Sequence, residues 1–432
     1  MASRLDNRTA DFEKDFTALL NSKRESDQDV TDAVKAILAE VRERGDAAVI
    51  DYTSRFDRLQ LTPETMRVSP EEIAAARANV KDDVKAALQE AADRIEVFHK
   101  RHLPEDDSFT DAQGVTVGAR WTAVDAAGIY VPGGKAVYPS SVLMNAIPAK
   151  AAGVERIVMV VPAPDGYLNP LVLVAAELAG VTEIYKVGGA QAVGALAYGT
   201  ETISPVDVIT GPGNAYVAAA KREVFGIVGI DMIAGPSEIL VVADNKNDPR
   251  WIAMDLLSQA EHDEVAQSIL ITDDEAYAKM VADAVEDHLA TLPRANIART
   301  SWDEHGVIIV VNDLEEAAPL VNRLAPEHLE LAVDNPRELA KDMKHAGSIF
   351  LGRYTPEAIG DYVAGPNHVL PTARNARFTS GLSALNFMKR NTLIECSAES
   401  LARIGPAAVT LAEEEGLQAH GRSISIRLDA SE

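Results

Sequence analysis

The chain has 432 residues, of which 47% are hydrophobic and 25% are charged. This length and balance exclude a single small module, a collagen-like or low-complexity chain, and a globally disordered protein. Lys and Arg number 41 against 66 Asp and Glu, so the net charge is −25. Excess acid repels phosphate backbones and anionic lipid, and no basic run opposes it, so we expect no nucleic-acid and no membrane partner.

The sequence contains one cysteine, Cys396, and no apolar stretch of about 18 residues that could span a membrane. An intrachain disulfide and a CxxC motif are therefore excluded. The N-terminus also lacks the apolar core of a secretion signal. These features predict a protein of a reducing compartment, most simply the cytoplasm. Cys396 follows a carboxylate, Glu395, which disfavours a reactive thiolate, so we do not expect a catalytic thiol.

The first quarter of the chain has the periodicity of helices. Apolar residues recur at helical spacing over 34–41 and again over 84–95. Ser69 and Glu72 flank a proline in the pattern of a capping box, which predicts a helix beginning at Pro70. These apolar stripes are expected to be core faces, so we assign them no chemistry.

After residue 120, short β-branched apolar runs alternate with helical stretches. One of these helices is delimited by Asn169 and Pro170 at its start and by Gly180 at its end. Alternation of this kind predicts an α/β fold with parallel strands and helices on both faces, in one large sheet or two smaller ones. The expected strands lie at 157–161, 184–187, 206–209, 239–242, 269–271 and 307–311.

Residues 128–235 hold more than half of the 27 glycines. Glycine at the end of a strand lets a ligand approach the backbone, and the helix that follows offers free N–H groups to an anion. Neither a GxGxxG fingerprint nor a GxxxxGK[ST] loop is present, so the pattern predicts a nucleotide-type ligand without defining it. Tight turns without a ligand are the alternative. The three clusters are YVPGG at 130–134, VGGAQ at 187–191 and TGPGNAY at 210–216.

Three histidines lie beside residues that could bind a metal or share acid–base chemistry. No HExxH spacing is found, and a single Glu-His pair is more often a surface feature than a ligand pair. On residue chemistry alone, Glu261 with His262 is favoured over Gln259, because an amide oxygen is an uncommon zinc donor. The three strings are QAEH at 259–262, PEHLE at 326–330 and EGLQAH at 415–420.

Together these motifs resemble the histidinol dehydrogenase family in sequence and in order. The resemblance covers nearly the whole chain in one register and is least distinctive before residue 110. The matching strings are GIYVPGG at 128–134, YPSSVLMNAIPAK at 138–150, VGGAQAV at 187–193, GPGNAYV at 211–217, AGPSE at 234–238, LSQAEH at 257–262, PEHLE at 326–330, GDYVAGPNHVLPT at 360–372 and EGLQAH at 415–420.

The resemblance implies an NAD-dependent oxidoreductase of histidine biosynthesis, which oxidises L-histidinol to L-histidine in two steps through a retained aldehyde. It implies one Zn²⁺ per site and replaces Glu261 by Gln259 as a ligand. The implied zinc ligands are Gln259, His262, Asp361 and His420. The implied NAD contacts, one in each glycine cluster, are Tyr130, Gln191 and Asn214. The implied substrate contacts are Ser237, Gln259, His262, His328, Asp361, Glu415 and His420.

Two neighbouring residues would carry the proton chemistry in such an enzyme. His328 is the implied proton acceptor, because a neutral imidazole can take the hydroxyl proton before hydride leaves. Glu327 is the implied residue that polarises the water added to the aldehyde. Zinc would mainly hold the substrate by its nitrogens. His368 is expected only near the site.

The implied architecture is two incomplete Rossmann-like α/β/α domains with a small N-terminal helical arm and a helical C-terminal tail. We expect an arm at 1–25, a larger domain at 26–131 plus 237–381, a glycine-rich NAD-binding domain at 132–236 and a dimerisation tail at 382–432. The family forms homodimers with intertwined subunits. A tail this short gains burial by packing on a second copy, so we expect His420 to complete a shared active site.

Three other functions fit parts of the pattern. A paralogue that oxidises another polar alcohol, such as a sulfonated diol, would share the scaffold, although Ser237, Glu327 and His328 all match the histidinol pattern. A zinc hydrolase could use the same His, Asp and Glu residues with a metal-bound water, but the glycine clusters would then have no role. A non-catalytic binding protein would be expected to lack Glu327 or His328, and both are present.

Overall fold

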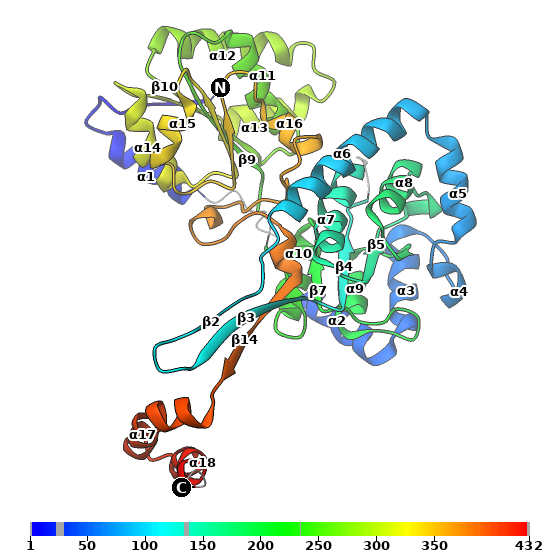
Figure 1. The fold of residues 1–432 in the computed structure, drawn as a ribbon. Helices are drawn as coiled ribbons and strands as arrows, with labels where there is room; N and C mark the ends of the chain where they lie inside the picture. Colours follow the sequence, from blue (N-terminus) through cyan, green and yellow to red (C-terminus); the bar gives the residue numbers. More distant parts are fainter. Residues whose placement is uncertain (1, 23–29, 134–137, 234, 430–432) are drawn as a thin grey trace.

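The computed structural model describes residues 2–22, 30–133, 138–233 and 235–429. The end of the expected arm at 23–25, and the Gly134 and Ala234 of the motifs above, lie outside the described residues. Figure 1 shows two α/β bodies side by side and a slender ribbon that carries the C-terminal helices away from both. The predicted α/β class with parallel sheets is confirmed. No helix of the described residues is both long and apolar enough to cross a membrane.

The first body contains a parallel sheet in the order β6-β5-β4-β7-β8 and is called the five-stranded body below. Gly180, at φ 80°, ends α8 in the left-handed conformation for which glycine is suited. The strands are β4 (Ala126–Tyr130), β5 (Arg156–Val160), β6 (Glu183–Tyr185), β7 (Val208–Thr210) and β8 (Gly229–Ile230). The crossover helices are α7 (Pro139–Ala152), α8 (Pro170–Ala179), α9 (Gly189–Tyr198) and α10 (Ala215–Val224).

Helices from the first quarter of the chain cover both faces of this sheet. Side chains alternate across a strand, so Val158 of β5 joins the core beneath α2 and α9, whereas Ile157 joins the core beneath α6. The predicted capping box of Ser69 and Glu72 is present at the start of α5. The helices are α2 (Thr31–Arg44), α3 (Asp46–Asp57), α4 (Pro63–Met66), α5 (Pro70–Asn79) and α6 (Asp82–Arg101).

The second body contains a parallel sheet in the order β1-β11-β10-β9-β12-β13 and is called the six-stranded body. Leu240 and Val241 of β9 point into separate cores on its two faces. The strands after β1 are β9 (Glu238–Ala243), β10 (Gln267–Thr272), β11 (Val307–Val310), β12 (His328–Ala332) and β13 (Ser348–Leu351). The helices after residue 240 are α11 (Pro249–Ala260), α12 (Glu275–Leu289), α13 (Ala295–His305), α14 (Ala317–Leu324), α15 (Pro336–Leu339) and α16 (Glu357–Tyr362).

One expected domain boundary is wrong. The expected domain joins 26–131 to 237–381, but β4 pairs with both β5 and β7 at the centre of the five-stranded sheet, and α2 to α6 cover that sheet, so these elements belong to the five-stranded body. The N-terminal arm is not purely helical either. Its strand β1 (Ser3–Asp6) pairs with β11 at the edge of the six-stranded sheet, and α1 (Phe12–Asn21) buries two phenylalanines in the same body.

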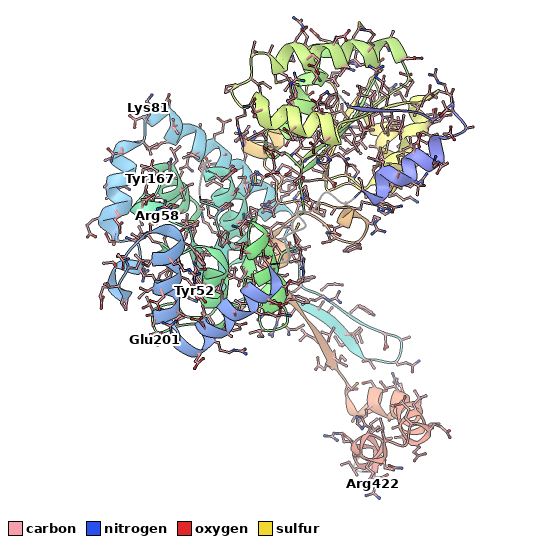
Figure 2. All side chains as sticks on the ribbon, turned by 180° about the vertical axis from the view of Figure 1, so that it is seen from behind. Tyr52, Arg58, Lys81, Tyr167, Glu201 and Arg422 are labelled. Carbon is pink, nitrogen blue, oxygen red and sulfur yellow. The ribbon has the colours of Figure 1, made fainter. Side chains whose placement is uncertain are left out.

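The helices of the expected tail are preceded by a strand. β14 (Met388–Glu395) pairs antiparallel with β3 (Thr116–Ala123), which also pairs with β2 (Asp107–Thr110). This ribbon leads to α17 (Ala398–Glu414) and α18 (Gln418–Asp429), which pack on each other. Figures 1 and 2 show both helices apart from the two bodies, with Arg422 of α18 at the far end. Several apolar side chains of the tail are left uncovered: Ile394 is 74% exposed, Leu411 64% and Ile426 60%.

Candidate active site

A cavity of about 300 Å³, called the catalytic cavity, lies where the carboxyl end of β7 faces the amino ends of β9 and β12. The turn after β7 supplies Gly211 and Gly213, and Ser237 immediately precedes β9. Six residues that the sequence analysis assigned to metal, substrate or proton chemistry line this cavity together. They are Ser237, Gln259, His262, Glu327, His328 and Asp361.

A second cavity, of about 450 Å³, lies along the carboxyl edge of the five-stranded sheet and is called the glycine cavity. Tyr130, Gln191 and Asn214, one from each glycine cluster, all line it. Gly213 lines both cavities, so the turn after β7 is a shared wall. The three clusters meet because the carboxyl ends of parallel strands lie along one edge of a sheet.

The polar groups of the glycine cavity are held in fixed positions. The Tyr130 hydroxyl accepts a hydrogen bond of 3.0 Å from the Gly189 backbone N–H. Burial raises the pKa of Tyr130 to about 12, so the hydroxyl stays neutral. Asn214 accepts from the first backbone N–H groups of α10. The side chain of Gln191 is buried, and its Oε1 has no hydrogen-bond partner among the described residues.

A buried ion pair clamps the shared turn. Lys221 and Asp231 form this pair, and both side chains are almost fully buried. Lys221 Nζ donates to the Gly211 carbonyl at 2.9 Å, while the Gly211 N–H donates to Asp231 Oδ2 at 2.8 Å. Gly211 has φ 114°, and a Cβ there would lie 2.1 Å from the Tyr130 carbonyl oxygen. Only glycine fits this position, and the ion pair holds both of its backbone polar groups.

The environment of His328 fixes one ring nitrogen as a donor and leaves the other free. His328 Nδ1 lies 2.9 Å from the carbonyl oxygen of Glu238. A carbonyl can only accept, so Nδ1 carries the proton and Nε2 keeps its lone pair. Nε2 has no hydrogen-bond partner among the described residues and lies 3.6 Å from Glu357 Oε1 and 3.9 Å from Asp361 Oδ1. Burial lowers the pKa of His328, although Asp361 opposes this. The ring is therefore a neutral proton acceptor.

Glu327 is a buried carboxyl beside this imidazole. Its Oε2 accepts a hydrogen bond of 2.9 Å from the Glu238 backbone N–H and lies 3.7 Å from His328 Nδ1. Burial raises the pKa of Glu327 well above its usual range, and the nearby carboxyls of Glu238, Asp361 and Glu357 add to this. A carboxyl with a raised pKa can take up and release a proton near neutral pH.

The end of α11 presents two potential metal ligands, and α16 presents a third. Gln259 Nε2 lies 3.1 Å from His262 Nδ1, because the turn that follows α11 brings these two residues together. Gln259 Oε1 is buried without a hydrogen-bond partner among the described residues. Burial lowers the pKa of His262 to about 4 and raises that of Asp361 to about 6. A neutral imidazole and a carboxylate are common zinc ligands, and the amide oxygen, although a less usual donor, can complete the set.

Glu357 is a member of this site that the sequence analysis missed. It is buried one helical turn before Asp361, and its Oε1 has no hydrogen-bond partner among the described residues. His328, Glu357 and Asp361 offer ligand atoms within 4.8 Å of one another, a grouping that differs from the expected zinc set. The spacing of four residues between Glu357 and Asp361 was the available signal.

Of the remaining candidates, only His368 lines the catalytic cavity. Glu261 caps the end of α11 and does not line the catalytic cavity. Glu415 and His420 lie in the tail, are exposed, and line neither cavity. His368 lines the catalytic cavity and donates from Nδ1 to the Asp361 carbonyl at 3.1 Å. Cys396 is exposed on the tail.

The fold and the site together define an α/β enzyme in which buried acid–base residues face a glycine-lined cavity. Comparison with known proteins identifies the family. The histidinol dehydrogenase family model matches residues 20–428. The histidinol dehydrogenase of Rhodospirillum rubrum is 66% identical over 99% of both chains, and that of Ruegeria pomeroyi is 63% identical over 98% of both. The crystal structure of histidinol dehydrogenase from Elizabethkingia anophelis matches with a TM-score of 0.95 at 39% identity, over 99% of this chain and 98% of that chain. The chain belongs to the histidinol dehydrogenase family and is an oxidoreductase.

Proposed function

We propose that the enzyme is a cytoplasmic, zinc-dependent dehydrogenase that oxidises L-histidinol to L-histidine in two NAD-linked steps via L-histidinaldehyde, the last reaction of histidine biosynthesis. The observation that carries this proposal is the free Nε2 of His328, beside Glu327, in a cavity that shares one wall with the glycine cavity. Membership of the histidinol dehydrogenase family supports the choice of substrate.

The chain offers a fitting place for each cofactor. Zinc would be held by Gln259, His262 and Asp361, and the unpartnered Oε1 of Gln259 supports this. The metal, when bound, would position the substrate through its imidazole and amino nitrogens. NAD, which accepts a hydride in each oxidation, would lie in the glycine cavity against three residues that meet there. These residues are Tyr130, Gln191 and Asn214.

In the first oxidation, His328 Nε2 takes the hydroxyl proton of the alcohol, so that the carbon can release hydride. The Glu238 carbonyl holds the ring in the tautomer that this step needs. In the second oxidation, Glu327 orients a water molecule and takes its proton as the oxygen adds to the aldehyde, while His328 returns the proton of the first step to the carbonyl oxygen and so frees its Nε2 again. His328 then accepts the hydroxyl proton of the resulting hydrate as the second hydride leaves. Ser237 lines the same cavity as a substrate contact.

We also propose that two chains share each active site in a homodimer. Glu415 and His420, the expected substrate and metal residues of the tail, line neither cavity of their own chain. The tail that carries them leaves Leu411 and Ile426 uncovered. A second copy would bury this apolar surface and would bring His420 of the partner subunit to the ligands of the catalytic cavity.

The direct test follows NADH formation with L-histidinol, with and without a zinc chelator. Two NADH per histidinol, loss of activity on chelation and recovery with zinc are expected. NAD reduction with a sulfonated diol but not with histidinol would favour the paralogue instead. Hydrolysis of an amide or ester without NADH formation would favour the zinc hydrolase.

The shared site has a separate test, based on two inactive chains. His262→Asn and His420→Asn each remove one proposed ligand. In a mixed dimer, one site collects both defects and the other collects neither, so reassembly of equal amounts should restore roughly a quarter of the parental activity. Each variant reassembled alone is the control. If mixed dimers form and no activity returns, His420 acts within its own chain.

A further inference from the structure

Asp57, which the mechanism above does not use, forms part of the wall of the glycine cavity. It is the last residue of α3 and is only 9% exposed, and its Oδ2 has no hydrogen-bond partner among the described residues. Burial raises its pKa, although a hydrogen bond from the Ala163 backbone and the charge of the neighbouring Arg58 oppose the shift. A carboxylate at this end of a helix also faces the negative pole of the helix dipole. Burial, helix position and a missing partner all cost stability, so packing alone does not explain this side chain.

The rest of the described wall carries no charge. Apart from Asp57, it consists of neutral polar groups, glycines and apolar side chains, including Ile37, Phe56 and Tyr216. The neighbouring Arg58 does not line the cavity. Its Nε and Nη2 donate to the two carboxylate oxygens of Asp165 at 2.7 and 2.6 Å, on an exposed part of the five-stranded body (Figure 2). The cavity thus combines one anion with flat apolar surfaces and, among the described residues, no lysine or arginine.

We propose that Asp57 is the residue that makes the enzyme select NAD over NADP, by accepting hydrogen bonds from the adenosine ribose hydroxyls and repelling a 2′-phosphate. This inference rests on the proposed function, which places NAD in the glycine cavity. A carboxylate can accept from both hydroxyls of a ribose, as an acidic residue does in dinucleotide-binding folds. The same carboxylate beside a phosphate dianion discriminates against NADP, because no lysine or arginine of the described residues lines the cavity and Arg58 is paired with Asp165 outside it. The free Oε1 of Gln191 is a further acceptor on the same wall.

The test compares three variants of the full-length enzyme. Asp57→Asn should raise the KM for NAD about tenfold and should reduce the preference for NAD over NADP by about tenfold or more, with the KM for L-histidinol unchanged. Asp57→Glu keeps the negative charge but shifts its position, so this variant should bind NAD more weakly and should still bind NADP poorly. Asp51→Asn is the matched control, because Asp51 lies on the same helix but is exposed and paired with Arg44. Asp51→Asn should change neither the KM for NAD nor the preference for NAD over NADP.

Direct titration of NAD and NADP into each folded variant accompanies the kinetics, and the melting temperature reports folding. An unchanged NAD-to-NADP preference in Asp57→Asn overturns the assignment of Asp57. If Asp57→Asn does not fold, Asp57→Glu decides, because unchanged NAD affinity in that variant overturns the assignment as well. Failure of the parental enzyme to oxidise histidinol with NAD would instead remove the proposed function, so the two failures are distinguishable.

Discussion

The two parallel sheets present opposite edges to the site. The five-stranded sheet presents its carboxyl edge, where turns such as Gly211 to Gly213 follow the strands. The six-stranded sheet presents its amino edge, where Glu327 and His328 stand at the start of β12. Ligands of open α/β sheets usually bind at carboxyl ends, so only the first sheet follows that rule. The two edges therefore differ in what they offer. The glycine turns of the five-stranded sheet let a ligand approach the backbone closely, whereas the buried strand starts of the six-stranded sheet hold acid–base side chains.

The largest effects are expected at the amino edge of the six-stranded sheet. His328→Gln should lower kcat for histidinol oxidation about 1000-fold or more, because an amide has no basic nitrogen to take the hydroxyl proton. Glu327→Gln should act mainly on the aldehyde, by about 100-fold. NADH formation from L-histidinol and from directly supplied L-histidinaldehyde separates the two steps. Equal losses in both steps for both variants would contradict the division of roles.

The carboxyl edge of the five-stranded sheet should respond through cofactor binding instead. Lys221→Met leaves the buried carboxylate of Asp231 without its cation, which should lower the free energy of unfolding by about 3–5 kcal/mol. The loosened Gly211 turn should raise the KM for NAD about tenfold, with a smaller change in kcat. Denaturant unfolding and NAD titration measure the two effects. Lys35→Met, at an exposed lysine paired with Glu223, is the control. If folded Lys221→Met has an unchanged KM for NAD, the Lys221–Asp231 ion pair contributes to stability and not to NAD binding.

A smaller effect concerns stability against acid in the helical layer of the five-stranded body. Burial lowers the pKa of His99, in α6, to about 4. In the unfolded chain a histidine titrates near pH 6.5. Between about pH 4 and 6.5 the imidazole of His99 is therefore protonated in the unfolded state and neutral in the folded state. His99 should therefore lower the free energy of unfolding by at most about 3 kcal/mol as the pH falls from 6.5 to 4.

Above pH 6.5, His99 should have no such effect. In His99→Phe the acid-induced loss of stability should shrink but not vanish, because burial also lowers the pKa values of His262, His328 and His368, which line the catalytic cavity. Urea unfolding at about pH 7 and about pH 5 measures how steeply the free energy of unfolding changes with pH. The half-buried His345, mutated to Gln, is the control, because it does not act on His99. An unchanged slope in His99→Phe would show that burial of this ring does not couple to folding.

The smallest effect is expected outside both sheets. Cys396 is exposed at the end of the ribbon and lines neither cavity, so Cys396→Ser should leave both oxidation steps unchanged. Steady-state rates with the alcohol and with the aldehyde check this. Trapping of an acyl group on the thiol during turnover would overturn the non-covalent mechanism.

Local sequence patterns predicted the parts of the fold that local chemistry determines. The capping box at Ser69 and the glycine stop at Gly180 both lie where expected. Long-range pairing was not predictable in the same way. The strand β1 has only four residues, too few to show a period, and it is defined by its partner β11. The placement of β4 likewise depends on neighbours that follow it in the chain, so the domain boundary at residue 131 was misplaced.

The candidate site shows the same division. Gln259 and His262 were predictable as neighbours from their spacing, and the glycine clusters were predictable as one site because parallel strands share an edge. Asp57 carries no local motif, since tertiary packing alone brings the end of α3 to the glycine cavity. Glu357 was hidden for a simpler reason: carboxylates at helical spacing are common on surfaces, and only its burial marks this one.

Gln259 Oε1 has no hydrogen-bond partner among the described residues, so the proposed metal would also stabilise the folded chain. A buried hydrogen-bond acceptor without a partner lowers the free energy of unfolding by about 1–3 kcal/mol. A cation that binds this oxygen in the native state removes that penalty and does not stabilise the unfolded state. The melting temperature should therefore rise with the concentration of free divalent metal even when no substrate is present. In a cell that is short of zinc, the enzyme would then be less active because its metal site is empty. It would also be less abundant, because the folded chain unfolds and is proteolysed faster.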